Sequence, residues 1–364
     1  MRKITENIRR VAALTTGRQD WGIMRSTCSA LRADARFELQ VYVSGMHWDY
    51  ASGPAVDDPL AQRVDDLAEI LRRNRPEALI LVGDRSETLA AALAATLERV
   101  PIVHLHGGEE TEGAIDNALR HALTKLAHLH LVSHDSHARR VRQMGEDPGT
   151  IHVVGAPGLD NLLRDDLPGR APLEQRLGLA LEDPVVIVTL HPATLGGEPA
   201  REAQALMDAM ESTRATWIIT QPNYDAGHEA IRERWWAFVH KRPRTVLVDA
   251  LGDRDYWGLM RLAAALLGNS SSGVLEAPAA GLPAVNVGDR QRGRLRSEHV
   301  IDVPAETEAI VTGLRLALTP ATRARLKVLP GPYPPPPAAP RIVEALAAWS
   351  PPCPPRKIFH DLEY

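Results

Sequence analysis

Short apolar runs rich in valine, isoleucine and leucine alternate along the chain with longer stretches whose apolar positions recur at helical spacing. Such runs predict buried strands, and the longer stretches between them predict amphipathic helices. Regular alternation of the two indicates parallel strands joined by right-handed crossovers, as in an open α/β sheet. In the first half we expect strands at 11–16, 37–44, 78–84, 102–106, 129–133 and 151–155, with helices at 21–32, 87–97, 114–126 and 136–144.

A second series of strands and helices follows a polar stretch at 165–183. Two series predict two Rossmann-like, doubly wound domains facing a central cleft, because open parallel sheets bind ligands beyond the carboxyl ends of their strands. The expected domains are 1–168 and 169–330, followed by a proline-rich connector at 331–364 whose short helix packs back on the body. The strands of the second series are expected at 185–190, 217–220, 246–248, 265–267 and 284–287.

Composition and charge narrow the range of partners. The chain has 364 residues, enough for roughly two domains, and its net charge of −4 favours no nucleic acid. No apolar run approaches the ~20 residues of a membrane span, and the first residues do not resemble a signal peptide, so we expect a cytoplasmic protein. Two cysteines are too few for a disulfide framework.

Several common catalytic motifs are missing. The sequence has no Gly-x-Gly-x-x-Gly after a strand, no Tyr-x-x-x-Lys pair, no phosphate loop ending in Gly-Lys-Ser/Thr and no Gly-x-Ser-x-Gly. These gaps argue against nicotinamide chemistry, kinases and serine hydrolases, and we expect no cofactor.

Polar residues of the first half gather where strands should end. Asp84 and Arg85 follow the third strand, and His104 and His106 close the fourth, directly before Glu109. Because parallel strands end at one edge of a sheet, these carboxylates, imidazoles and guanidiniums should share one rim. The next stretch adds Glu112, Asp116, Arg120 and His121.

The second half has an equivalent rim. His191 and Asn223 follow two of its strands, and the loop 268–273 runs into a helix that carries Glu276. Backbone N–H groups and hydroxyls at the start of a helix suit a phosphate or diphosphate. Arg290, after the next strand, would add positive charge. The loop's candidate ligands are Ser270, Ser271, Ser272 and Gly273.

Each signal has a simpler explanation. Ser270 and its neighbours could serve only as a helix N-cap, and Glu109 could lie on a solvated loop. His104 and His106 alternate along a strand and so share a face, which would suit a metal, but no third ligand matches them and packed histidines explain them equally well.

The motifs as a set resemble the UDP-N-acetylglucosamine 2-epimerases, and in particular their hydrolysing branch in sialic and legionaminic acid pathways. The resemblance spans roughly residues 8 to 318 and implies the two-domain glycosyltransferase-B architecture and a homodimer or homotetramer. It rests on Arg18-x-Asp20-aromatic-Gly22, Gly83-Asp84-Arg85, the run from His106 to Asp116, Arg120-His121-Ala122, Gly155-x-Pro157-Gly158-x-Asp160, His191-Pro192-x-Thr194, Pro222-Asn223-x-Asp225, Gly268 to Gly273, and Gly288-Asp289-Arg290-Gln291.

This family implies inversion at C2 of UDP-N-acetylglucosamine without a redox cofactor or metal. The C2 proton is removed, UDP leaves C1, and 2-acetamidoglucal forms. Water then adds to give N-acetylmannosamine and UDP, or UDP returns to give UDP-N-acetylmannosamine. Close relatives accept diacetylbacillosamine or a GDP-linked sugar, and a glycosyltransferase of the same architecture or a metal hydrolase are the competing classes.

The resemblance also assigns roles to residues. Many relatives carry Glu at the position of His106, so Glu109 or Glu112 would have to supply that carboxylate. The catalytic set is then Asp84, Glu109, Glu112, Asp116 and His191. The substrate-binding set is Arg18, Arg85, His106, His121, Asn223, Ser270, Ser271, Ser272, Gly273, Glu276 and Arg290, with Arg18, Ser271, Ser272 and Arg290 on the diphosphate and Glu276 on the ribose.

Overall fold

The computed structural model describes residues 8–44, 60–240 and 242–362, which form two compact units. The first unit consists of Met1–Glu109, Asp116–Leu163 and Pro334–Tyr364, and the second of Glu110–Ile115 and Arg164–Tyr333. Both units are therefore discontinuous in sequence. The short segment Glu110–Ile115 belongs to the second unit although the first unit precedes and follows it in the chain. The C-terminal segment from Pro334 belongs to the first unit although it follows the second.

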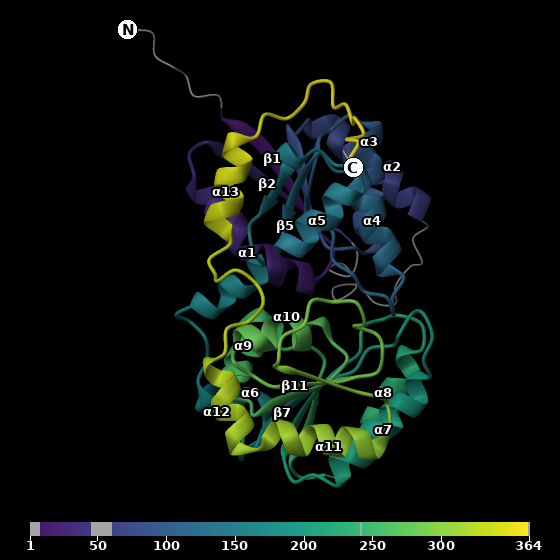
Figure 1. Ribbon diagram of the computed structural model, residues 1–364, viewed down its shortest axis with the longest axis vertical. Helices are drawn as coiled ribbons and strands as arrows, with labels where there is room; N and C mark the ends of the chain where they lie inside the picture. Colours follow the sequence, from purple (N-terminus) through teal and green to yellow (C-terminus); the bar gives the residue numbers. More distant parts are fainter. Residues whose placement is uncertain (1–7, 45–59, 241, 363–364) are drawn as a thin grey trace. The chain divides into compact units, whose positions relative to one another are not determined.

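The first unit contains a six-stranded parallel sheet in the order β2-β1-β3-β4-β5-β6 (Figure 1). Its strands are β1 (Arg9–Thr15), β2 (Phe37–Val43), β3 (Ala78–Val82), β4 (Ile102–Leu105), β5 (Leu129–Val132) and β6 (Ile151–Val153). Its helices are α1 (Arg18–Ala33), α2 (Leu60–Asn74), α3 (Ser86–Leu97), α4 (Asp116–Leu126), α5 (Asp135–Gln143) and α13 (Ala339–Ala348), with 3₁₀ helices η2 (Pro148–Thr150) and η3 (Pro157–Leu163).

The second unit contains another six-stranded parallel sheet, in the order β12-β11-β10-β7-β8-β9. Its strands are β7 (Val185–Thr189), β8 (Thr216–Thr220), β9 (Thr245–Val248), β10 (Ala265–Gly268), β11 (Ala284–Val287) and β12 (Val300–Val303). Its helices are α6 (Arg170–Leu177), α7 (Pro199–Glu211), α8 (His228–Val239), α9 (Gly252–Leu262), α10 (Ser271–Ala279), α11 (Thr307–Leu318) and α12 (Pro320–Val328).

The strand order reverses once in each sheet. In the first unit this point lies between β1 and β3, and in the second between β7 and β10. Chains leave the sheet in opposite directions at such a point, which opens a crevice beyond the strand ends where α/β proteins bind ligands. Asp84 and Arg85 follow β3, His191 follows β7 and the Ser-rich loop follows β10, whereas His106, Asn223 and Arg290 follow the neighbouring strands β4, β8 and β11.

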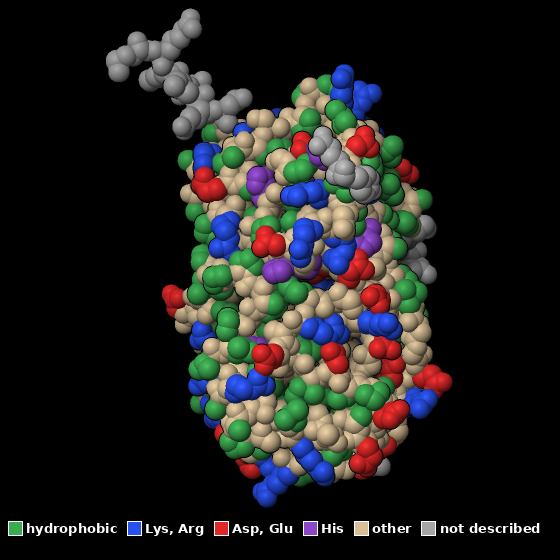
Figure 2. Space-filling view, viewed as in Figure 1, with side chains coloured by type: hydrophobic (Ala, Val, Ile, Leu, Met, Phe, Trp, Pro, Cys, Tyr) green, Lys and Arg blue, Asp and Glu red, His purple; other side chains and the backbone are tan. Residues whose placement is uncertain are grey.

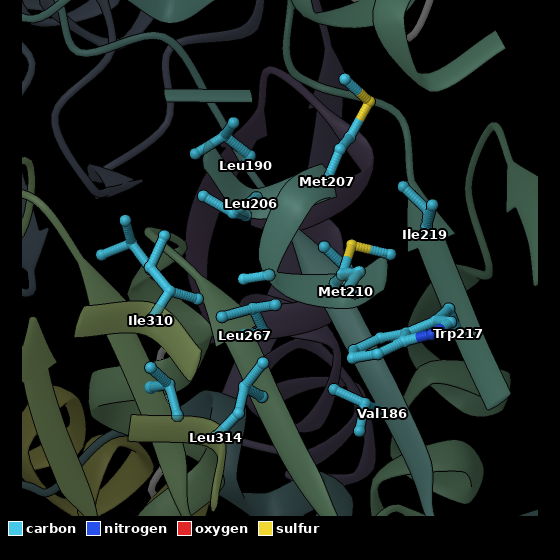
Figure 3. Close-up of a cluster of buried hydrophobic side chains, with 14 of the residues drawn as sticks. Val186, Leu190, Leu206, Met207, Met210, Trp217, Ile219, Leu267, Ile310 and Leu314 are labelled. Atoms are coloured by element: carbon cyan, nitrogen blue, oxygen red, sulfur yellow. The ribbon is translucent and has the colours of Figure 1, made fainter. Parts of the chain in front are cut away.

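Buried apolar side chains explain why these segments form strands. All five residues of β3 and of β7 are buried, as is typical of strands covered on both faces by helices. The core of the second unit packs side chains of β7, β8 and β10 against α7 and α11 (Figure 3). The labelled side chains in that view are Val186, Leu190, Leu206, Met207, Met210, Trp217, Ile219, Leu267, Ile310 and Leu314.

The structure corrects three details of the predicted elements. The strands β3 and β4 end before Asp84 and His106, so both residues lie in loops. The helix α2 and the strand β12 were not predicted. In β12 every residue is at least partly exposed and only β11 pairs with it, so its apolar signal is weak.

The C-terminal helix α13 packs on α1 in the first unit. Both carboxylate oxygens of Asp160 accept hydrogen bonds at the start of this helix, from the N–H groups of Ala338 at 2.6 Å and Ala339 at 2.9 Å. Arg341 donates to the carbonyl of Val154 at 2.7 Å. The Gly155-to-Asp160 motif therefore holds the returning tail.

In the described part of the chain, no helix has the length and apolar character needed to cross a membrane. Lys and Arg side chains are interspersed with Asp and Glu on the face shown in Figure 2.

Candidate active site

Asp84 lies two residues beyond β3, and its carboxylate forms an ion pair with Arg120 on α4. Arg120 is only 1% exposed and also donates to the carbonyl of Glu109 at 2.9 Å and to the side-chain oxygen of Asn117 at 3.2 Å. Burial opposes its charge, but the carboxylates of Asp84 and Glu109 outweigh burial and raise the pKa of Arg120. A permanent buried cation thus links Asp84 to the loop after β4.

Asp20 adds a second carboxyl group near Asp84. It lies in the first turn of α1 and accepts hydrogen bonds from the N–H of Thr16 at 3.2 Å and from the hydroxyl of the same residue. Burial raises the pKa of Asp20, and Asp84 raises it further, against the lowering effects of Thr16 and Arg85. The Nε atom of Arg85 lies 3.6 Å from Oε2 of Glu87. The predicted Arg85 therefore belongs to a cluster of charged side chains, with Asp20 and Glu87, at the point where the strand order reverses.

His106 and Glu109 contact each other directly beyond β4. The Nδ1 atom of His106 lies 2.7 Å from Oε1 of Glu109, and the same oxygen accepts a hydrogen bond from Ser133 at 2.8 Å. The Ser133 hydroxyl lies 2.9 Å from Nδ1 of His137. All four side chains are buried. The solvated loop considered for Glu109 is therefore wrong.

Glu112 is separated from this cluster. It belongs to the second unit, its side chain is half exposed, and it pairs with Arg292 at 3.0 Å. Its N–H donates to the carbonyl of the same Arg292. Of the two carboxylates considered as replacements at His106, only Glu109 lies beside His106.

His104 is a buried residue whose ring contacts neighbouring loop and helix groups. Its Nε2 lies 2.8 Å from the carbonyl of Gly83, and its Nδ1 lies 3.4 Å from the hydroxyl of Thr124. Burial lowers the pKa of His104 to about 4, so the ring is neutral at pH 7. His106 lies beyond the strand, so the two rings do not share a strand face as expected. Across the described ranges, no three His, Cys, Asp or Glu residues are grouped to hold a metal.

Three other predicted residues lie on helices of the first unit, two of them at helix starts. Asp116 begins α4, is half-buried and contributes to the raised pKa of Arg120. His121 follows Arg120 on the same helix and is also half-buried. Arg18 begins α1, and its side chain lies outside the described part of the structure.

In the second unit, His191 is held beyond β7 by two asparagines. Its N–H and carbonyl bond to the side chain of Asn269 at 2.8 Å and 2.9 Å. Its Nδ1 accepts from the N–H of Asn223 at 3.0 Å. A neutral His191 therefore carries its ring proton on Nε2. The predicted Asn223 acts on this ring through its backbone.

The loop after β10 starts α10. A Cβ atom on Gly268 would lie 1.9 Å from the carbonyl oxygen of Thr189, so only glycine fits there. Ser270 is the N-cap of α10 and accepts from the N–H of Ser272 at 3.3 Å, while the Ser272 hydroxyl lies 2.8 Å from that of Tyr256. The capping role of Ser270 is real. The half-buried Ser271 and the buried Gly273 lie in the first turn of α10 and are not part of this cap.

Arg290 and Glu276 lie beside this loop. Arg290 donates to the carbonyl of Asn269 at 3.2 Å and is half-buried. Glu276 is half-buried on α10 and, after burial itself, is the main group that raises the pKa of Tyr256. Both therefore lie near residues of the Ser-rich loop, and their roles at the diphosphate and the ribose stay predictions.

The segment Glu110–Ile115 packs on the Arg290 loop within the second unit. A Cβ atom on Gly113 would lie 2.6 Å from the carbonyl oxygen of Asp289 and 2.7 Å from the Cα of Arg290. The N–H of Leu195 donates to the carbonyl of Gly113 at 3.3 Å. The glycine of this motif is thus needed for a close backbone approach, beside the loop that follows His191.

Sequence reasoning gave no role to Arg120, Ser133, His137 and Asn269. One signal was available for Arg120, which lies four residues after Asp116 and so on the same helix face. Ser133 directly follows β5, at the rim where other site residues had been sought. His137 lies on α5 and supports Ser133 through its Nδ1 atom.

Two Rossmann-like units, with acid–base groups beyond the strands of one and an Ser-rich helix start in the other, define an enzyme of the glycosyltransferase-B fold class. The family model described as UDP-N-acetylglucosamine 2-epimerase matches residues 52–347. The chain belongs to this family.

Relatives and solved structures agree with that assignment. The chain is 34% identical over 338 residues to the UDP-N,N'-diacetylbacillosamine 2-epimerase (hydrolyzing) of Legionella pneumophila, covering 85% of this chain and 89% of the relative. It is 30% identical over 322 residues to the GDP/UDP-N,N'-diacetylbacillosamine 2-epimerase (hydrolyzing) of Campylobacter jejuni, covering 81% and 84%.

The fold is similar to that of the UDP-GlcNAc 2-epimerase from Neisseria meningitidis, solved bound to UDP-GlcNAc. The TM-score is 0.79 at 17% identity, covering 93% of this chain and 99% of the other. The cleft between domains and the homodimer or homotetramer stay predictions.

Proposed function

We propose that this enzyme inverts C2 of a UDP-linked 2-acetamido sugar by eliminating UDP and then adding water, so that the free 2-epimer and UDP are released. The observation that carries the proposal is the pair of acid–base assemblies beyond adjacent strands of the first unit, Asp84 with Arg120 and His106 with Glu109. The hydrolysing relatives support release of UDP rather than its recapture.

Elimination needs a base and a stabilised leaving group, because the C2 hydrogen is only weakly acidic. Asp84 takes the proton from C2 as the C–H electrons form the C1=C2 bond. The C1–O bond breaks and UDP leaves with its electron pair. Arg120 keeps Asp84 in place through the buried ion pair. Asp116, which begins the same helix as Arg120, is the second carboxylate of this set.

The second unit supplies the groups for the nucleotide. Ser271, Ser272 and Gly273 lie in the first turn of α10, where N–H groups and the helix dipole favour an anion. Arg290 adds a cation next to this loop. His191, with its proton on Nε2, is the donor proposed for the leaving group. Arg18 is proposed for the diphosphate and Glu276 for the ribose hydroxyls.

The decoration of the sugar has two candidates. UDP-N-acetylglucosamine is the substrate implied by the family description, whereas the relatives from Legionella and Campylobacter are named for N,N'-diacetylbacillosamine. The two sugars share the 2-acetamido group and differ away from C2. The same elimination therefore applies to both, and the two must be compared side by side.

Proton NMR in deuterated water tests the proposal. Each UDP-sugar is incubated with the enzyme, and we expect loss of the C2–H signal, release of UDP and a deuterated free sugar of inverted configuration. Transfer without C2 exchange would instead indicate a glycosyltransferase. An epimer that keeps its UDP would indicate the non-hydrolysing reaction.

A further inference from the structure

The hydrogen bonds around Glu109 determine which ring nitrogen of His106 is available for chemistry. A carboxylate only accepts, so Nδ1 of His106 is the donor across the 2.7 Å contact. Ser133 gives its single hydroxyl proton to the same oxygen, so His137 must donate to Ser133 from Nδ1. Burial lowers the pKa of His137 to about 4, which leaves it neutral with one N–H. Glu109 thus orients His106 as a carboxylate orients a catalytic histidine.

The other ring nitrogen of His106 faces no partner. Nε2 is buried without a hydrogen bond to any described residue, and the whole residue is 8% exposed. A buried polar atom without a hydrogen bond is unfavourable. His106 also has a φ of +65°, a left-handed conformation that non-glycine residues adopt rarely. Backbone strain of this kind clusters at functional sites, where an unpaired ring nitrogen can bind or transfer a proton.

The position of His106 would allow it to act on the same substrate as Asp84, as a second proton-transfer group. Val82 pairs with Leu105 in the register of β3 and β4, so the loops that carry Asp84 and His106 leave the sheet at adjacent strand ends. The N–H of Gly83 also donates to the carbonyl of Leu105 at 3.3 Å. Arg120 connects the two assemblies, because it pairs with Asp84 and donates to the carbonyl of Glu109 at 2.9 Å.

Inversion at C2 gives a reason for two proton-transfer groups. A proton removed from one face of the carbon must be replaced by another from the opposite face, which a single fixed group does not reach. We propose that His106, oriented by Glu109, is a catalytic residue that delivers the second proton to C2 when water adds to the glucal; this inference rests on the proposed function.

The proton balance of this step closes. The charged imidazole gives its Nε2 proton to C2, the C1=C2 electron pair forms the new C–H bond, and the oxygen of water bonds to C1. The proton lost by the water restores the imidazolium. Asp84 releases to solvent the proton that it took in the elimination. The net reaction converts the UDP-sugar and water into the free epimer, UDP and one proton.

The substitution His106→Asn tests the role of Nε2 alone. Asparagine can still donate to Glu109 from its amide and adopts positive φ readily, so the loop is preserved. We expect elimination to continue, with release of UDP and accumulation of 2-acetamidoglucal, while hydration of added 2-acetamidoglucal in the presence of UDP falls about 100-fold or more. Glu109→Gln should shift the products in the same direction.

The elimination step itself shows that the variant is folded, and His152→Gln, on the edge strand β6, is the matched histidine control. Hydration at the wild-type rate by His106→Asn would overturn the proposal. An equal loss in both half-reactions would also overturn it, because it would indicate a positioning role only. A wild-type enzyme that releases no UDP from either sugar would instead refute the proposed function, and the inference with it.

Discussion

Asp84 and Arg120 show how one buried residue prepares another for chemistry. The guanidinium is 1% exposed, whereas the Asp84 side chain is 22% exposed, so the carboxylate alone faces the surface of the unit. Truncating the Asp84 side chain would leave the buried guanidinium without this side-chain oxygen acceptor, whereas an amide of the same shape can still accept from it. The role of Asp84 as a base can therefore be tested only with a variant that keeps its shape.

The substitution Asp84→Asn should abolish exchange of the C2 hydrogen, by roughly 100-fold or more, because an amide does not accept this proton. UDP should still bind, since Asp84 is not among its proposed ligands, most of which belong to the second unit. NMR measures the exchange and calorimetry measures the binding of UDP. Asp65→Asn, an exposed position on α2, is the control. Unchanged deuterium incorporation would refute the role of Asp84.

At the scale of elements, some of the motifs that resemble the family hold helices in place, whereas others carry the proposed catalytic residues. Asp160 belongs to one of these motifs, yet its carboxylate caps α13, about half the chain away in sequence. The first residues of a helix leave N–H groups unpaired, and a side-chain acceptor there stabilises the helix. Asp160 thus ties the C-terminal helix to the first unit.

We expect Asp160→Ala to lower the free energy of unfolding by about 1–2 kcal/mol, because two buried N–H groups lose their acceptor. Chemical denaturation with urea measures this loss. Asp165→Ala, an exposed neighbour, should change stability by less than about 0.5 kcal/mol. Equal stability of the two variants would show that the cap contributes nothing.

At the scale of the whole molecule, the tail beyond α13 returns to the first unit. Lys357 donates to Glu146, which also binds Lys125 at 2.6 Å and His130 at 3.0 Å. Burial opposes the charge of Glu146, but these three hydrogen bonds prevail and hold its pKa at about 2. A carboxylate with a lowered pKa stabilises the folded state above its ordinary pKa and loses that effect in acid.

This cluster predicts a pH-dependent difference between the wild-type protein and Glu146→Gln. Above pH ~4.5 the wild type should be more stable by on the order of 2–3 kcal/mol, and the gap should narrow as the pH falls toward 2. Urea titrations at several pH values measure it. Glu298→Gln, which removes an exposed pair with Arg325, should show almost no difference. A gap independent of pH would contradict the assignment.

The sequence by itself determined the α/β class, most strands and two rims of strand ends, one with Asp84 and His106 and the other with His191 and the Ser-rich loop. These follow from local apolar patterns and from the rule that parallel strands end together. It missed α2, although Val64, Leu67, Ala68 and Leu71 recur there at helical spacing, and it missed β12, whose partly exposed residues weaken the apolar pattern.

Only the tertiary structure showed that Glu109 contacts His106 while Glu112 pairs with Arg292, and only it showed the partners of Arg120, Ser133 and the C-terminal helix. The two glutamates are three residues apart in one loop, but one is buried against His106 and the other pairs with Arg292. The environment of each glutamate depends on contacts with residues far apart in the chain, such as Ser133 and Arg292. Local sequence propensity does not predict such contacts.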